Sequence, residues 1–237
     1  MNKRYWLVIL TYGLTQVSAF IGVPLLLILG FQQEQIPGIW SFISFPIGLA
    51  IILWLLRPDF RNRHMIRNRS SRGEAVAWSI LGVILVFVAQ AIAAYIEMTV
   101  FGIEPGSENT EMIVEVTRAF PAFIIVTSII GPILEEIVFR MIIFGALYKR
   151  FNFWIAALLS SFIFAAVHLD FTHLLVYTAA GFAFAFLYVK TKRILVPIVA
   201  HVAINVYVVL VNLIFYDKIM DLQRQLEELQ MFIGGLL

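Results

Sequence analysis

Long runs of apolar residues constrain the fold of this chain more than any other feature. The first two, Tyr5–Leu29 and Ile36–Leu56, each reach the roughly 20 residues that a helix needs to cross a bilayer. Of the 237 residues, 61% are hydrophobic and only 14% are charged, whereas about 25% are charged in an ordinary soluble domain. A soluble fold of this size cannot hide so much apolar surface, so the sequence predicts an integral membrane protein.

The apolar runs predict an all-α polytopic membrane bundle of about seven transmembrane helices, forming a single domain over residues 1–237. The predicted spans are Tyr5–Leu29, Ile36–Leu56, Ala75–Phe101, Val116–Leu147, Phe153–His168, Leu174–Val189 and Leu195–Tyr216. Pro121 and Pro132 should bend or interrupt the fourth span, because proline lacks an N–H and clashes with the preceding turn. The remaining segment, 217–237, spaces Leu222, Leu226 and Leu229 along one helix face and is expected to be an amphipathic tail on the membrane surface.

Charged residues divide between the two sides of the predicted membrane. The link Arg57–Glu74 holds six arginines, and basic residues also follow the fourth and sixth spans, at Lys149-Arg150 and Lys190–Arg193. The link Gly102–Glu115 holds four glutamates and no basic residue. By the positive-inside rule the N-terminus is cytoplasmic, and we expect a multi-pass protein of the plasma membrane.

The basic residues also indicate which partners to expect. The arginine-rich link is expected to touch anionic lipid head groups. Nucleic acid is not expected as a partner, since membrane topology already accounts for the positive charge. The chain has no cysteine, which excludes disulfides, a thiolate nucleophile and a cysteine-ligated metal.

Few ionisable side chains remain inside the spans. On translocon scales, inserting a charged side chain at the centre of a membrane helix costs about 2.5 to 3.5 kcal/mol. The ionisable side chains that remain are Glu135, Glu136 and Arg140 in the fourth span, His168 in the fifth and His201 in the seventh, with Asn205 as an uncharged addition. Glu97 lies near the outer end of the third span, where we expect it to reach water. His64 in the arginine-rich link and His173 in an outer turn are both expected to be solvated or interfacial residues, and of the two His173 is expected to lie closer to the site.

The spacing of these residues predicts specific pairs. Glu136 and Arg140 are four residues apart in the acid-before-base order that favours an ion pair on one helix face. Glu135 points about 100° away from Glu136 and is left as a surplus carboxylate. His201 and Asn205 are also four residues apart and share a face. Each pattern also has a purely structural interpretation. Glu136 and Arg140 could form an ion pair that only joins helices, and His168 could be a residue of the membrane interface. His201 and Asn205 could form only an interhelical hydrogen bond.

Together these residue types suit a site that activates water. Peptide hydrolysis without a serine or cysteine nucleophile needs a base for the water, which Glu or His supplies. It also needs donors for the oxyanion, which Asn and protonated His supply. Two His and one Glu also form one of the ligand sets that hold a catalytic zinc. A divalent metal held by Glu135, His168 and His201 therefore stays an alternative.

At these residues the chain resembles the CPBP family of intramembrane endopeptidases, the CAAX-processing and bacteriocin-processing proteases also called the Abi family. That family is marked by the motifs E-E-x-x-x-R, F-x-x-x-H and H-x-x-x-N on separate helices. All three occur in that order, as Glu135-Glu136…Arg140, Phe164…His168 and His201…Asn205. The resemblance covers roughly residues 116–216, which are expected to form the catalytic core.

The resemblance implies cleavage of a peptide or protein substrate, and it implies a role for each motif residue. Glu135 activates the water with help from His168, His201 and Asn205 stabilise the oxyanion, and Glu136 and Arg140 orient the site. The family has been called both metalloprotease and metal-independent glutamate protease. We favour the glutamate route, because Asn and Arg suit oxyanion binding and positioning.

Two other functions use the same residues. A proton- or ion-coupled carrier would place the Glu, Arg and His residues along an ion pathway, and carriers of this kind often contain internal repeats. The sequence shows no such repeat. A non-enzymatic scaffold would use the buried polar groups only to fix helix packing. The three motifs together favour the protease.

The depths of the site residues set a geometric condition. Glu135 lies about 20–25 Å from the turn near Lys149, whereas His201 lies about 10 Å from the Lys190–Arg193 turn, at 1.5 Å per helical residue. For Glu135 and His201 to meet, we predict that one turn is offset in depth, either because the hairpin projects or because the last span starts deeper.

Overall fold

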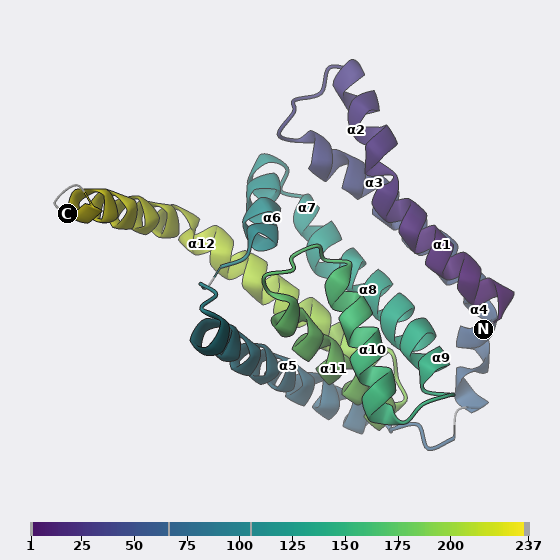
Figure 1. Ribbon diagram of the computed structural model, residues 1–237. Coiled ribbons are helices and arrows are strands. Elements are labelled where there is room, and N and C mark those ends of the chain that lie inside the picture. The colour runs from purple at the N-terminus through teal and green to yellow at the C-terminus, as the bar shows by residue number, and fades with distance from the viewer. Residues whose placement is uncertain (1, 66, 105, 235–237) are drawn as a thin grey trace.

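The computed structural model describes residues 2–65, 67–104 and 106–234, and every regular element in these ranges is a helix (Figure 1). Helices are expected, because a helix satisfies its backbone hydrogen bonds internally and lipid cannot supply partners. Five helical segments in the described residues are long and apolar enough to cross a bilayer: Lys3–Ile28, Ile36–Leu55, Arg72–Phe101, Leu174–Thr191 and Leu195–Phe215. The predicted polytopic helical bundle is confirmed.

The elements in chain order are α1 (Lys3–Val17), α2 (Ala19–Ile28), α3 (Ile36–Leu55), α4 (Arg57–Arg61), η1 (Asn62–Met65), α5 (Arg72–Phe101), α6 (Glu108–Ala119), α7 (Phe123–Ile125), η2 (Val126–Ile130), α8 (Gly131–Glu135), η3 (Glu136–Phe144), α9 (Gly145–Leu147), α10 (Phe153–Ala166), α11 (Leu174–Thr191) and α12 (Leu195–Gly234). Segment η1 is 3₁₀-helical, and η2 and η3 are π-helical. Helix α11 is central, since it packs against α5, α10 and α12.

The fourth predicted span begins later than expected. Residues 116–119 belong to α6, which ends at Ala119, and the membrane segment starts at Phe123. Phe120 lies between them with φ −140° and ψ 88°. The residue before a proline is pushed out of the α region, so Pro121 separates α6 from the span. Pro132 does not interrupt the helix, which passes through it with π-helical segments on both sides.

The last helix is longer than the predicted span. Helix α12 continues without a break from Leu195 to Gly234, so the tail is an extension of the seventh span rather than a separate helix. Figure 1 shows this extension projecting beyond the rest of the bundle. The leucines at 222, 226 and 229 are exposed along it.

The predicted depth offset between the two turns is wrong. Leu147 and Phe153 flank one turn, and they pack in the same apolar cluster as Tyr188 and Val189, which precede the other turn. The turns therefore lie at a similar depth. Part of the excess length is absorbed by η3, because a π-helix closes its hydrogen bonds over one more residue than an α-helix and advances less per residue.

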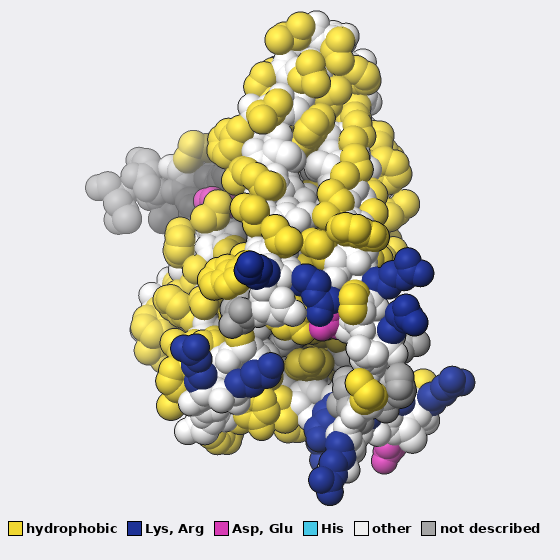
Figure 2. All heavy atoms as spheres, turned by 90° about the vertical axis from the view of Figure 1, so that its right-hand side faces the viewer, with side chains coloured by type: hydrophobic (Ala, Val, Ile, Leu, Met, Phe, Trp, Pro, Cys, Tyr) yellow, Lys and Arg dark blue, Asp and Glu magenta, His cyan; other side chains and the backbone are white. Residues whose placement is uncertain are grey.

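Charged segments divide between the two ends of the bundle, as predicted. We call the end that carries α4 and the turns at 148–152 and 192–194 the basic end; Arg4, Lys149, Arg150 and Lys192 line one pocket there. At the opposite end, which we call the acidic end, Ser107 before α6 donates a hydrogen bond of 2.8 Å to Asp170 in the turn before α11. Figure 2 shows Lys and Arg side chains gathered on the lower half of one face, below a hydrophobic band.

Close packing of α10 on α11 requires a glycine. A Cβ on Gly181 would lie 2.8 Å from the Ser161 Cβ and 3.0 Å from its Cα. Gly181→Ala is therefore expected to lower the free energy of unfolding by about 1–3 kcal/mol through overpacking. The measurement is the thermal midpoint in detergent, compared with Gly13→Ala, whose Cβ would meet nothing within 4 Å. Equal midpoints for the two variants would contradict this packing.

Candidate active site

Four of the six predicted site residues line one cavity of about 870 Å³, namely Glu135, His168, His201 and Asn205. The cavity also reaches the link between α5 and α6, where Glu104 and Ser107 line it, so it extends toward the acidic end. The other two predicted residues, Glu136 and Arg140, lie behind the cavity wall with fully buried side chains.

A buried charge cluster fixes one side of the site. The predicted ion pair is present, with Arg140 Nε 3.3 Å from Glu136 Oε2. The Arg140 guanidinium also lies over two aromatic rings, 4.3 Å from the centroid of Phe164 and 5.3 Å from that of Phe184. Its terminal nitrogens have no hydrogen-bond partner among the described residues. The aromatic faces therefore supply the electrostatic contact that these nitrogens lack.

His201 connects the two glutamates, a contact that sequence reasoning did not predict. Its Nδ1 lies 2.9 Å from Glu136 Oε1, and its Nε2 lies 3.6 Å from Glu135 Oε2. A carboxylate oxygen accepts, so Nδ1 carries a hydrogen. An ionised Glu135 facing a bare Nε2 lone pair would be repelled. The close approach is therefore favourable when one proton resides between Glu135 and His201.

His168 presents its second nitrogen to the cavity. Helix α10 ends at Ala166, and His168 Nδ1 lies 2.8 Å from the Phe164 carbonyl, one of the last carbonyls that the helix itself leaves free. Because a carbonyl only accepts, Nδ1 carries a hydrogen, and in the neutral ring Nε2 then keeps its lone pair. The ring stacks on Tyr177 at 4.3 Å between centroids. The four-residue spacing of the F-x-x-x-H motif therefore places His168 where the Phe164 carbonyl can orient its ring.

Asn205 is held by a carbonyl that Pro132 leaves free. In a π-helical register the N–H of residue 132 would bond to the carbonyl of residue 127, and proline has no N–H. The Thr127 carbonyl instead accepts from Asn205 Nδ2 at 3.3 Å. An amide nitrogen has two hydrogens, so one N–H of Asn205 is used here and the other is left for a ligand in the cavity.

The structure corrects the prediction for Glu97. Its side chain does not reach water but is buried, with a relative exposure of 3%. One carboxylate oxygen accepts from the backbone N–H groups of Leu175 and Val176 at 3.0 and 3.2 Å, and the other lies 2.9 Å from His173 Nδ1. Glu97 therefore caps the N-terminus of α11 from the neighbouring helix α5.

Glu97 and His173 both line the active-site cavity. His173, which was expected as an interfacial residue, thus lies at the edge of the site. Hydropathy alone did not indicate that Glu97 meets the N-terminus of α11, because the N–H groups that it accepts from lie 78 and 79 residues away in the chain. Tyr177, which stacks on His168 and accepts from Asn109 at 3.2 Å, was missed for the same reason.

Removal of the Glu97 cap should loosen α11. Glu97→Ala is expected to lower the free energy of unfolding by about 1–2 kcal/mol, because the first N–H groups of α11 lose their acceptor. The measurement is the thermal midpoint in detergent beside Glu111→Ala, an exposed glutamate on α6. A midpoint as high as that of the Glu111 variant would mean that the cap contributes nothing.

The three residues named as alternative zinc ligands are not arranged as a metal site among the described residues. Glu135, His168 and His201 all line the cavity. Among the described residues, however, no group of three or more His, Asp or Glu side chains is arranged to hold a metal ion. The residues present do not fit the metal alternative.

Comparisons with known proteins agree with the motifs. The family model for type II CAAX prenyl endopeptidases of the Rce1-like kind matches residues 117–207, which include all six predicted site residues. The chain is 46% identical over 245 residues to "Putative membrane peptidase YdiL" of Bacillus subtilis (strain 168), covering 100% of this chain and 99% of that protein. It is 34% identical over 226 residues to "Membrane-embedded CAAX protease MroQ" of Staphylococcus aureus (strain USA300), covering 89% and 91%. No solved structure matches the chain.

Proposed function

The chain belongs to the Rce1-like family of CAAX-type membrane endopeptidases, the CPBP family, and we propose that it hydrolyses a peptide bond with a water molecule activated at Glu135. One observation carries this proposal. The two nitrogens of His201 contact both glutamates, at 2.9 and 3.6 Å, beside a cavity that Glu135 lines.

In this mechanism Glu135 is the general base. It accepts a proton from the attacking water, whose oxygen bonds to the scissile carbonyl carbon. His201 Nε2 lies 3.6 Å from Glu135 and holds the carboxylate in place while Glu135 carries that proton. The proton then passes to the departing nitrogen as the carbon–nitrogen bond breaks. His168, with an unprotonated Nε2 on the same cavity, accepts a hydrogen bond from the water and orients it.

The oxyanion is stabilised from α12. Asn205 offers the N–H that Thr127 does not use, and a protonated His201 offers Nε2–H. Glu136 and Arg140 act as positioning residues, because Glu136 fixes the His201 tautomer and Arg140 neutralises Glu136 in the bundle interior. We propose this metal-free route over a zinc route, since the described residues form no three-ligand group.

The substrate is a peptide or protein that enters the bundle. MroQ is named a CAAX protease, so we propose cleavage of a peptide segment held at the membrane. The positive-inside rule makes the basic end cytoplasmic, with the N-terminus on that side in the plasma membrane. The cavity, which reaches toward the acidic end, then opens toward the outer leaflet.

The test is cleavage itself. Purified protein in detergent is incubated with a panel of membrane-associated peptides, and products are identified by mass spectrometry. Products from the wild type but not from Glu135→Gln support the proposal. If the wild type cleaves nothing while transporting protons or ions across liposomes in a Glu135-dependent manner, the protein uses the same residues as a carrier.

A further inference from the structure

A second cavity, of about 1440 Å³, lies at the basic end and shares no lining residue with the active-site cavity. It lies between the N-terminus of α1, helix α4, the turn after α9 and the end of α11. Polar and charged groups line one part of it, and apolar side chains of three helices line the rest, among them Ile9, Met141, Ile143 and Ile163.

The charged part of this cavity is strongly positive. Four cations line it, Arg4, Lys149, Arg150 and Lys192, against one acid, Asp59. Asp59 already has partners. Arg4 forms an ion pair with it at 3.0 Å, and the Tyr5 hydroxyl donates to it at 2.7 Å. Three positive charges therefore remain without an acidic partner in the part of the chain that the structure describes.

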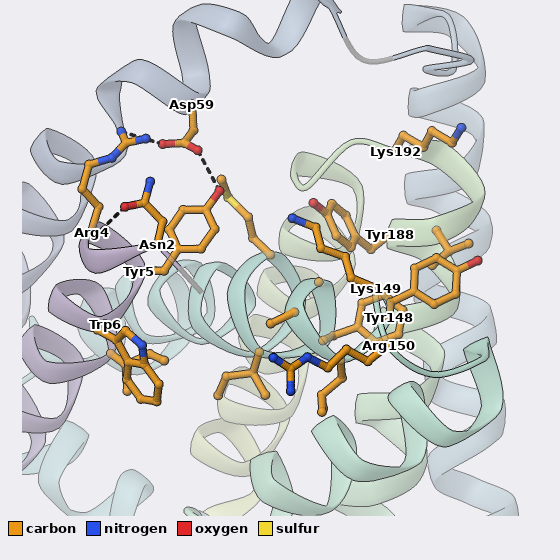
Figure 3. A pocket seen from close by; sticks show the side chains of 18 of the residues that line it. Asn2, Arg4, Tyr5, Trp6, Asp59, Tyr148, Lys149, Arg150, Tyr188 and Lys192 are labelled. Carbon is orange, nitrogen blue, oxygen red and sulfur yellow. Dashed lines mark hydrogen bonds and ion pairs between the residues drawn. The ribbon is translucent and has the colours of Figure 1, made fainter.

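The remaining cations are available to a ligand. Lys192 donates to the backbone carbonyl of Arg67 at 3.0 Å, which uses one of its three N–H groups. Lys149 and Arg150 are exposed and form no ion pair within the described part of the chain. In Figure 3 the Lys149 ammonium points into the cavity beside the Tyr188 side chain, and Tyr5 and Asp59 face it from the opposite wall.

We propose that this cavity binds an anionic phospholipid of the cytoplasmic leaflet, with the phosphate at Lys149 and Arg150 and an acyl chain along the apolar wall. Lys and Arg donate charge-assisted hydrogen bonds to phosphate oxygens, and basic pockets between spans on the cytoplasmic side are suited to anionic head groups. The apolar wall formed by Ile9, Met141 and Ile163 matches a lipid tail rather than a soluble anion.

The test measures retained lipid and thermal stability, which do not depend on peptide cleavage. Purified protein in neutral detergent receives micelles containing phosphatidylglycerol, phosphatidylcholine or no lipid, and soluble glycerol phosphate in a separate arm. Bound lipid is counted by native mass spectrometry. We expect phosphatidylglycerol to raise the thermal midpoint of the wild type and to stay bound, and phosphatidylcholine to do neither.

The variant pair is Lys149→Gln with Arg150→Gln, and the matched control is Arg57→Gln with Arg72→Gln, two exposed arginines that do not line the cavity. We expect phosphatidylglycerol to bind the first double variant roughly 30-fold more weakly, the loss for two basic residues at an anionic surface. Equal weakening in the control pair, equal retention of phosphatidylcholine, or the same stabilisation by glycerol phosphate would each overturn the lipid assignment.

Discussion

Glutamine at position 135 is expected to lower kcat for peptide cleavage by about 10²- to 10⁴-fold, the usual contribution of a general base. The amide has the shape of the carboxylate but cannot accept a proton from water. Substrate contacts elsewhere in the cavity are unchanged, so KM should change little. The measurement is steady-state cleavage of a quenched peptide by purified wild type and variant in the same detergent.

Two controls separate chemistry from folding in this experiment. Glu111→Gln makes the same change on an exposed face of α6 and should leave kcat unchanged. The thermal midpoint of the Glu135 variant should not fall, because the substitution removes the surplus negative charge beside His201. If Glu135→Gln keeps more than a tenth of the wild-type kcat, another group activates the water.

A strong chelator distinguishes the two routes to activated water. On the glutamate route, the wild type keeps its activity with chelator present, since no protein ligand has to hold a metal. Activity that disappears with chelator and returns with zinc would instead show that Glu135, His168 and His201 rearrange into a metal site during catalysis.

Local patterns predicted the helices and the contacts within each helix. Apolar runs gave the spans because lipid leaves a chain few alternatives to a helix. The four-residue spacing of Glu136 and Arg140 gave their ion pair, since residues so spaced lie on one face. The same spacing in F-x-x-x-H placed His168 over a carbonyl of its own helix.

Local patterns could not predict the contacts between segments that are far apart in the sequence. The bond from Glu136 to His201 joins residues 65 apart in the chain, and nothing in either motif indicates which glutamate His201 meets. The π-helical segments were also unforeseen, because they depend on how the whole helix packs rather than on a local signal. They matter to the site: η2 frees the Thr127 carbonyl for Asn205, and η3 helps to bring Glu135 to the depth of His201.

Removal of the Arg140 side-chain charge is expected to destabilise the fold more than any other single change near the site. Arg140→Met should lower the free energy of unfolding by about 3–5 kcal/mol, because Glu136 would be left as a buried charge with only its His201 hydrogen bond to compensate it. Both side chains are fully buried, so water cannot replace the lost partner. The measurement is the thermal midpoint in detergent, beside Arg57→Met, an exposed arginine with little expected effect.

The double variant decides whether the ion pair or the packing of Arg140 is responsible. Glu136→Gln together with Arg140→Met removes both charges and keeps similar volumes, so much of the lost stability should return. Its cleavage activity should stay low even so, because a neutral amide oxygen accepts the His201 Nδ1 hydrogen bond more weakly than the carboxylate does. If the double variant is as unstable as Arg140→Met alone, the stability comes from the contacts of the guanidinium with Phe164 and Phe184 rather than from its charge pairing with Glu136.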